Sequence, residues 1–198
     1  MTGIVIIGAG HAAGQAAASL RQAKFEGSIT IIGDEAHVPY QRPPLSKQYL
    51  AGTQVADKVY LRAEKFYADK DIQLMLDTRA TQIDPGTKTI NLDNGETIAY
   101  EKLLISTGSR PRKLSIEGSD LSGIHYLRTM DDVDGIRADV KPGANLVIVG
   151  GGYIGLEVAA VGIELGMNVH VLEMEERILQ RVTTPEMSAY YHTLHSDR

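Results

Sequence analysis

The sequence predicts an α/β fold built around two copies of one strand–helix–strand pattern. Each copy begins with a run of branched apolar residues, continues through closely spaced glycines, and ends in a second apolar run that is followed by an acidic residue. Short branched apolar runs are typical of buried parallel strands, and two parallel strands need a helical crossover between them. Because the pattern occurs twice in 198 residues, we expect two domains of related architecture.

The first copy opens with residues 4–7, an Ile-Val-Ile-Ile run that predicts a buried strand. Gly8 and Gly10 follow it, and they would turn the chain tightly and bring the backbone close to a ligand. The helix expected from Ala12 onward would present its free N–H groups to a pyrophosphate. Ala13 stands at the third-glycine position of the G-x-G-x-x-G fingerprint, where alanine suffices because that position needs only close helix–strand packing.

The second strand of this copy, residues 28–32, leads to Asp34. Asp34 lies 20 positions after Gly14, a spacing that suits a carboxylate holding a ribose hydroxyl. A single pattern of this kind is as typical of an ordinary glycine turn as of a dinucleotide site. The interpretation as a binding site therefore depends on the second copy.

The second copy has the complete fingerprint, between strands expected at residues 145–149 and 169–172. The fingerprint residues that we expect at the nucleotide are Gly150, Gly152, Tyr153, Ile154 and Gly155. Glu173 closes the second strand, 18 positions after Gly155, and would receive the adenosine ribose. Because an acid at this point opposes a 2′-phosphate, the pattern predicts NADH at the second site, with FAD at the first.

The composition restricts the partners and the location. The chain is 43% hydrophobic and 23% charged, with a net charge of −5 and no long basic run, so we expect no nucleic-acid partner. The absence of cysteine excludes a redox dithiol and is consistent with a reducing compartment. No segment has the roughly 18 apolar residues of a membrane span, and the first strand begins too early for a signal peptide. We therefore expect a cytoplasmic protein. We also expect no metal site, because the histidines lack the spacing of metal ligands.

Periodicity and turn residues predict the remaining elements. A short helix is expected at residues 63–68, strands at 73–76, 79–83, 87–92, 96–100 and 102–106, and helices from Met130 and at 185–194. Asp93-Asn94-Gly95 is a hairpin signal between two of these strands. Thr129 is expected to cap the helix that begins at Met130.

Residues 37–50 form a connector with three prolines that forbid a regular helix or central strand up to Pro44. Ser46 is expected to cap a short helix from Lys47. The plain interpretation is a stiff surface loop with two cations, Arg42 and Lys47. Because the loop directly follows the predicted ribose acid, it also suits a clamp on a pyrophosphate that approaches a flavin ring.

This connector carries a family resemblance. Its Tyr-Gln-Arg-Pro-Pro-Leu-Ser-Lys-Gln-Tyr-Leu segment resembles the signature of the ferredoxin, putidaredoxin and rubredoxin reductases. These are FAD-dependent, NAD(P)H-using partners of oxygenase electron chains within the pyridine nucleotide-disulfide oxidoreductases. Further similar segments follow in family order at residues 107–111, 127–129, 150–159 and 177–182. The resemblance implies two Rossmann-like units, residues 1–108 for FAD and residues 109–198 for NAD(H).

The resemblance also implies the roles of individual residues. It places backbone near Ala80 against the adenine of FAD, Gly108 beneath the bound FAD, and Arg128 in contact with it. It pairs Lys47 with Glu157 beside the flavin and the nicotinamide, which makes these two the candidate catalytic residues. The residues expected to hold FAD in the first domain are then Gly8, Gly10, Ala12, Ala13, Asp34, Arg42 and Lys47.

The implied activity is hydride transfer from NADH to FAD, followed by single-electron transfer to a 2Fe–2S ferredoxin or a rubredoxin. The chain departs from the family because the remaining NAD-domain strands, the return segment of the FAD domain and the interface domain are missing, so the fold is expected to be incomplete. Three interpretations remain open. The chain is a ferredoxin reductase, an NADH oxidase or flavin subunit of a larger reductase, or a truncated nucleotide-binding module without turnover.

Overall fold

The computed structural model describes residues 3–197. They form two compact units, residues 3–42 with Ala56–Arg110, and Pro43–Val55 with residues 111–197. Residues 43–55 thus pack with the second unit, although the predicted first domain includes them. The assignment of one domain to FAD and the other to NAD(H) stays a prediction.

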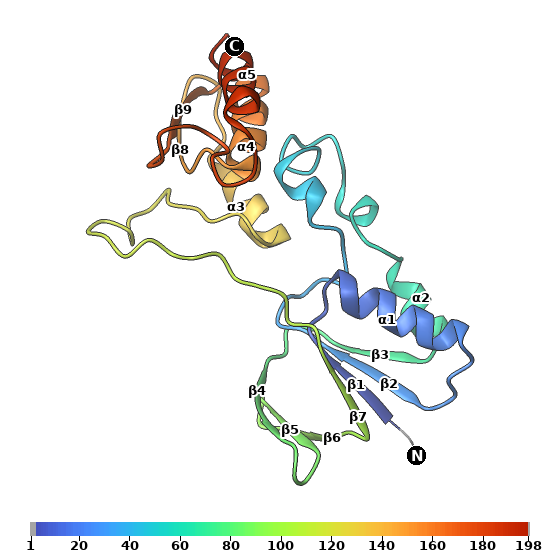
Figure 1. The fold of residues 1–198 in the computed structure, drawn as a ribbon. Helices are drawn as coiled ribbons and strands as arrows, with labels where there is room; N and C mark the ends of the chain where they lie inside the picture. Colours follow the sequence, from blue (N-terminus) through green and yellow to red (C-terminus); the bar gives the residue numbers. More distant parts are fainter. Residues whose placement is uncertain (1–2, 198) are drawn as a thin grey trace. The chain divides into compact units, whose positions relative to one another are not determined.

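The first unit is built on a four-stranded parallel sheet with the strand order β3-β2-β1-β7 (Figure 1). Its strands are β1 (Gly3–Ile7), β2 (Ser28–Ile32), β3 (Ile72–Met75) and β7 (Lys102–Ile105). Helix α1 (His11–Gln22) joins β1 to β2, and α2 (Glu64–Asp69) precedes β3. Because β2 and β7 lie on opposite sides of β1, the carboxyl end of β1 is the switch point at which sheets of this type bind ligands.

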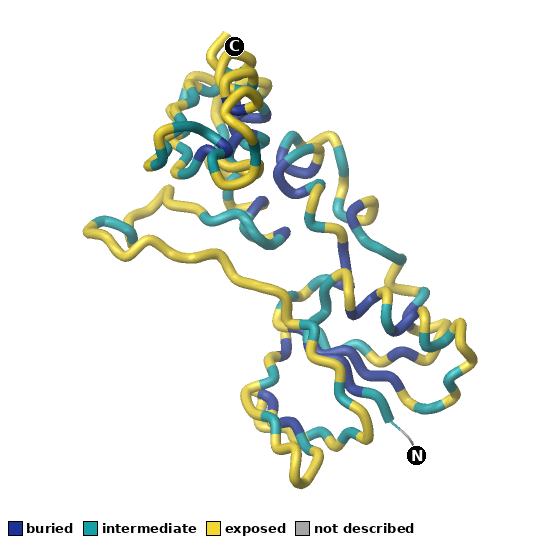
Figure 2. The backbone as a smooth tube through the Cα atoms, in the orientation of Figure 1, coloured by how far each residue is buried: buried dark blue, intermediate teal, exposed yellow. Residues whose placement is uncertain are grey.

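Both faces of this sheet are covered. On one face, strand residues pack with α1 and α2 in a cluster that contains Ile6, Ala13, Ala17, Ile29, Ile31 and Tyr67. On the other face, a cluster of Val5, Ile7, Ile32, Ile90 and Leu92 joins the strands to a second sheet. Figure 2 shows β1 and β2 as a buried centre between these layers, which is the environment that branched parallel strands require.

The second sheet of the first unit is a three-stranded antiparallel meander. It comprises β4 (Ala80–Asp84), β5 (Thr89–Leu92) and β6 (Thr97–Ala99) in sequential order. The predicted hairpin joins β5 to β6, where Gly95 has a φ of +86°. This positive φ explains why glycine ends the Asp-Asn-Gly turn.

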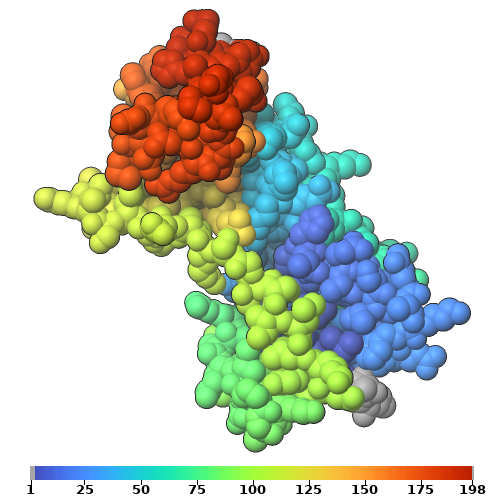
Figure 3. All heavy atoms as spheres, in the orientation of Figure 1, coloured from blue at the N-terminus to red at the C-terminus, as the bar shows by residue number. Residues whose placement is uncertain are grey.

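The second unit repeats the strand–helix–strand pattern once. Its parallel strands β8 (Asn145–Val149) and β9 (Asn168–Leu172) are joined by α4 (Tyr153–Glu164). Helix α3 (Met130–Asp139) comes before this pattern and α5 (Pro185–Ser196) after it. Helix α4 contacts both strands, while alternate strand residues such as Val149 and Leu172 stay exposed. Residues 111–125 run as a largely exposed, extended segment with turns (Figures 1 and 3).

The predicted bounds of the strands and α-helices agree with the structure within one or two residues. The prediction that was wrong is the short helix expected from Lys47 in the connector. No helix begins at Lys47. Instead, a 3-10 helix, η1 (Pro43–Ser46), ends where the cap was expected, and a second one, η2 (Ala56–Lys58), was not predicted. Proline fixes its own φ near −65°, which suits the first positions of such a turn. Within residues 3–197, no helix combines the length and apolar character of a membrane span.

Candidate functional site

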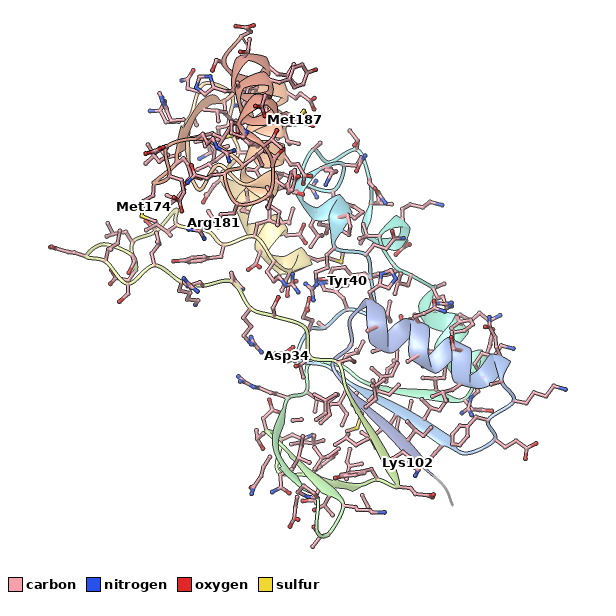
Figure 4. All side chains as sticks on the ribbon, viewed as in Figure 1. Asp34, Tyr40, Lys102, Met174, Arg181 and Met187 are labelled. Atoms are coloured by element: carbon pink, nitrogen blue, oxygen red, sulfur yellow. The ribbon has the colours of Figure 1, made fainter. Side chains whose placement is uncertain are left out.

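A cavity of about 340 Å³ opens at the carboxyl ends of β1 and β2 in the first unit. Its volume lies in the range of roughly 300–1,000 Å³ that small-molecule sites occupy. The lining includes Gly8, Asp34, Thr78, Ala80, Gly108 and Arg110. Figure 4 shows Asp34 at this edge of the sheet. The cavity therefore lies at the switch point of the sheet and brings four predicted site residues together.

The backbone conformation of Gly8 and the backbone that packs against it both require glycine at this position. Its φ is +104°, and its N–H donates to the carbonyl of Ile32 over 2.7 Å. A Cβ added there would lie 2.3 Å from the carbonyl oxygen of Ser106. Both the positive φ and this close approach exclude a side chain.

Gly10 differs, because neither its backbone conformation nor a contact with residues 3–197 requires glycine there. It caps α1 with a φ of −90° and a ψ of −165°, an extended conformation open to any residue. An added Cβ would meet no heavy atom within 4 Å. The open space lies at a helix N-terminus with free N–H groups, which fits the close approach of a phosphate. On the first turn of α1, Ala12 is exposed, whereas Ala13 is fully buried against the sheet.

The charged groups near the cavity are paired with one another. Asp34 forms an ion pair with Arg110, which is a lining residue to which the sequence had assigned no role. The Arg42 guanidinium lies 2.5 Å from Glu35 and 4.8 Å from the centre of the Tyr40 ring, and it is not among the lining residues. The sequence included Arg110 only within the family-like segment 107–111, because its 76-residue separation from Asp34 leaves no local pattern that pairs the two.

The remaining residues predicted for FAD, Lys47 and Arg128, belong to the second unit. The backbone N–H of Arg128 donates over 2.9 Å to Asp132, which also completes the capping box of α3 with Thr129. The cap predicted for Thr129 is thus present, and the Arg128 backbone extends it. A contact between Arg128 and FAD remains a prediction.

The glycine loop of the second unit repeats the geometry of the first. Gly150 has a φ of +111° and donates to the carbonyl of Leu172 over 2.8 Å. Gly152 caps α4 in an extended conformation, and an added Cβ would again meet nothing within 4 Å. Gly155 packs so closely that a Cβ would lie 2.1 Å from the carbonyl oxygen of Gly150. Tyr153 and Ile154 are exposed on the first turn of α4.

Glu173 closes β9 directly beside this loop. One oxygen of its carboxylate accepts the N–H of Gly151 at 2.8 Å, and the other accepts the N–H of Glu175 at 2.9 Å. The hydrogen bonds from Glu175 and then Gly151 hold the pKa of Glu173 below its usual value of 4.5, because they favour the charged form. The predicted ribose acid is therefore ionised and aligned with the glycine loop.

These hydrogen bonds predict a pH-dependent contribution of Glu173 to stability. A carboxylate with a lowered folded-state pKa stabilises the fold above its unfolded pKa, and this contribution is lost as the pH falls through the folded value. We expect Glu173→Gln to melt at a lower temperature than the wild-type chain at pH 7, and the difference to shrink as the pH falls below 4.5. Thermal unfolding followed by circular dichroism measures this. A difference that stays constant over this range would contradict the ionised state.

The predicted catalytic pair, Lys47 and Glu157, forms a cluster with Ser46 in the second unit. The Nζ of Lys47 lies 2.7 Å from Oε2 of Glu157, and the hydroxyl of Ser46 donates to the same oxygen over 2.5 Å. Ser46 is buried, while Lys47 and Glu157 are partly exposed. Contacts between η1 and α4 bring the two segments together. The sequence indicated Ser46 only as a helix cap. Its hydrogen bond to Glu157 could not be predicted, because the two residues are 111 positions apart.

Comparisons with known proteins agree with this architecture. The chain matches the family described as pyridine nucleotide-disulphide oxidoreductase over residues 2–198. It is 42% identical over 195 residues to a probable ferredoxin reductase of Castellaniella defragrans, covering 98% of this chain and 48% of that protein. It is 41% identical over 197 residues to a putidaredoxin reductase of Pseudomonas putida, covering 98% of this chain and 47% of that protein. The chain thus spans about half the length of the curated relatives that it matches.

Solved structures show the same fold. A ferredoxin reductase from Rhodopseudomonas palustris superimposes with a TM-score of 0.94 at 42% identity, covering 100% of this chain and 48% of that one. A putidaredoxin reductase in covalent complex with putidaredoxin gives a TM-score of 0.91 at 40% identity, covering 99% of this chain and 48% of that one. The predicted α/β fold and the family resemblance are both confirmed. On its sequence and on its fold, the chain belongs to the pyridine nucleotide-disulphide oxidoreductase family.

Proposed function

We propose that this chain holds FAD in its first unit and NADH in its second, and serves a flavoprotein that passes electrons from NADH to an iron–sulfur protein. The observation that carries the proposal is the pair of N-cap glycines, Gly10 and Gly152. At both positions an added Cβ would meet only open space, so the glycine is explained by a ligand rather than by the fold. Two such loops in one chain match the two nucleotides of the reaction.

The first unit offers a site for the adenosine part of FAD. The N-terminus of α1 beyond Gly10 would receive the pyrophosphate, and Asp34 would exchange its ion pair with Arg110 for a ribose hydroxyl. Ala80 and Gly108 line the same cavity, which agrees with the roles implied for both. Bound FAD would supply the ability to accept a hydride and release single electrons, and the protein would orient it.

The second unit would bind NADH on the loop from Gly150 to Gly155, with the adenosine ribose on Glu173. Lys47 and Glu157 would position the reacting rings. Because Glu157 accepts from both Ser46 and Lys47, its carboxylate is held in one orientation, and the Lys47 ammonium is fixed by it. The names of the relatives, ferredoxin reductase and rubredoxin-NAD(+) reductase, support an iron–sulfur or rubredoxin acceptor.

The experiment that tests the proposal is anaerobic reduction of a 2Fe–2S ferredoxin by NADH in the presence of the chain and FAD. We expect bleaching of the ferredoxin absorbance that depends on both cofactors. In a parallel aerobic assay without ferredoxin, NADH-dependent oxygen uptake at the same rate would favour an NADH oxidase instead. Nucleotide binding without any electron transfer would favour a binding module.

Removal of the Lys47 side chain is expected to slow flavin reduction. In Lys47→Ala, Glu157 keeps its bond to Ser46 but loses its cation, so the rings would be positioned less well, and misplacement of reacting groups commonly costs about 10-fold to 100-fold in rate. Stopped-flow reduction of bound FAD by NADH measures this.

Lys65→Ala is the matched control, because it removes a lysine from the exposed Lys65–Asp69 pair. Equal rates for the wild-type chain, Lys47→Ala and Lys65→Ala would show that the Lys47 ammonium has no such role.

A further inference from the structure

The Lys47–Glu157 pair is attached to the protein through a buried serine. The hydroxyl of Ser46 donates to Oε2 of Glu157 over 2.5 Å, and the Nζ of Lys47 lies 2.7 Å from the same oxygen. Among residues 3–197, no donor contacts the other oxygen, Oε1. The orientation of the carboxylate therefore depends on two donors at one atom.

The first donor, Ser46, is held rigidly by the connector. It ends η1, and only 4% of its surface is exposed. Pro43 and Pro44 fix their own φ at the start of this turn. The carbonyl of Pro44 accepts the N–H groups of Lys47 and Tyr49 over 3.0 Å each. Because a serine side chain has one rotatable bond before its hydroxyl oxygen, this fixed backbone presents the hydroxyl to α4 in one place.

The second donor, Lys47, follows the carboxylate instead of fixing it. Its side chain is 40% exposed, and its ammonium also donates to the carbonyl of Pro43 over 3.2 Å. A lysine is a point charge on a flexible stem, so it can pair with a carboxylate in many orientations. An ion pair exposed to this degree contributes little by itself. Ser46 thus fixes Glu157, and Glu157 in turn fixes Lys47.

We propose that Ser46 is a positioning residue of the reaction, acting through Glu157 to hold the Lys47 ammonium where the flavin and the nicotinamide meet. This inference rests on the role proposed above for the Lys47–Glu157 pair. Without the hydroxyl, only the partly exposed ion pair would hold the carboxylate, and both side chains would sample other rotamers. Removal of the Ser46 hydroxyl should therefore release Lys47 indirectly.

The first test follows the Lys47 amine in the full chain with no FAD added. A low dose of acetic anhydride acetylates a lysine faster when its ammonium leaves an ion pair, and mass spectrometry of the digested chain gives the rate for each lysine. Lys65, which is 83% exposed, is the internal reference. We expect Glu157→Ala to raise the Lys47 rate about threefold to fivefold, as a partly exposed ion pair contributes such a factor, and Ser46→Ala to raise it at least about twofold.

Two comparisons separate positioning from a general loss of structure. In a chain that already carries Glu157→Ala, Ser46→Ala should raise the Lys47 rate no further, because its effect passes through that carboxylate. Ser188→Ala is the matched control, since Ser188 is also buried in the second unit and its hydroxyl donates to the carbonyl of Ile178. This control should leave the Lys47 rate unchanged.

The second test is stopped-flow reduction of bound FAD over a range of NADH concentrations. We expect Ser46→Ala to lower the limiting rate about tenfold or more, because misplaced reacting groups cost at least this much. The NADH concentration that gives half of the limiting rate should stay unchanged. This separation of rate from affinity is expected of a residue that orients the rings and does not bind the nucleotide.

An unchanged Lys47 acetylation rate in Ser46→Ala would overturn the inference, as would an increase that persists in the Glu157→Ala chain or that Ser188→Ala reproduces. An unchanged limiting rate of flavin reduction would also overturn it. A wild-type chain that retains no FAD after gel filtration would instead overturn the proposed function, and acetylation would still report whether Ser46 holds the pair.

Discussion

Gly10→Val is expected to abolish FAD binding while leaving the fold intact. The branched side chain would fill the open space at the N-terminus of α1 and block the approach of the pyrophosphate. Loss of two charge-assisted hydrogen bonds, at about 1.5 kcal/mol each or more, weakens affinity by about 100-fold or more. Since the backbone at Gly10 is extended and an added Cβ is unobstructed, the free energy of unfolding should fall by less than about 1 kcal/mol.

Fluorescence titration with FAD and urea unfolding measure the two effects separately. Gly152→Val is the matched control, because Gly152 occupies the same position at the N-terminus of α4. It should weaken NADH binding and leave FAD affinity unchanged. If Gly10→Val bound FAD as tightly as the wild-type chain, the first glycine loop would be a turn and not a binding site.

Gly8→Ala is expected to have the largest effect on stability. Alanine at a φ of +104° is strained by about 1–3 kcal/mol. Its Cβ would also lie 2.3 Å from the Ser106 carbonyl oxygen, so β1 and the segment after β7 would have to separate. Together we expect a loss of about 3 kcal/mol or more, which lowers the melting temperature by roughly 10 °C or more.

Gly95→Ala separates the two causes. Gly95 also has a positive φ, +86°, but an added Cβ there meets nothing within 4 Å. This control should lose only the conformational part, about 1–2 kcal/mol. Differential scanning calorimetry of both variants gives the comparison, and equal melting temperatures would contradict the contact with Ser106.

The backbone architecture of both units could be predicted from the sequence because its signals are local. The runs at residues 4–7 and 145–149 and the glycines after them are short-range patterns, and the structure has a strand, a loop and a helix at each. Glu173 was found by the same logic, since it ends the strand that leads to it. These features depend on neighbours in sequence, so one sequence suffices to predict them.

The connector shows where local reasoning failed. Ser46 matched the profile of a helix cap, yet its hydroxyl donates to Glu157, and the chain forms η1 instead. Arg110 and Ser46 both have partners on distant elements, so spacing alone could not identify either. The same is true of the packing of residues 43–55 with the second unit, because it results from contacts of η1 with α3 and α4.

The most direct test of the account is the absorbance spectrum of the purified chain with FAD, recorded anaerobically before and after NADH is added. The account predicts a bound flavin band that remains after gel filtration and bleaches on addition of NADH, because it proposes that both loops bind their nucleotides and that the Lys47–Glu157 pair positions the rings. A chain that elutes without flavin would contradict the central claim, as would a bound flavin that NADH leaves oxidised.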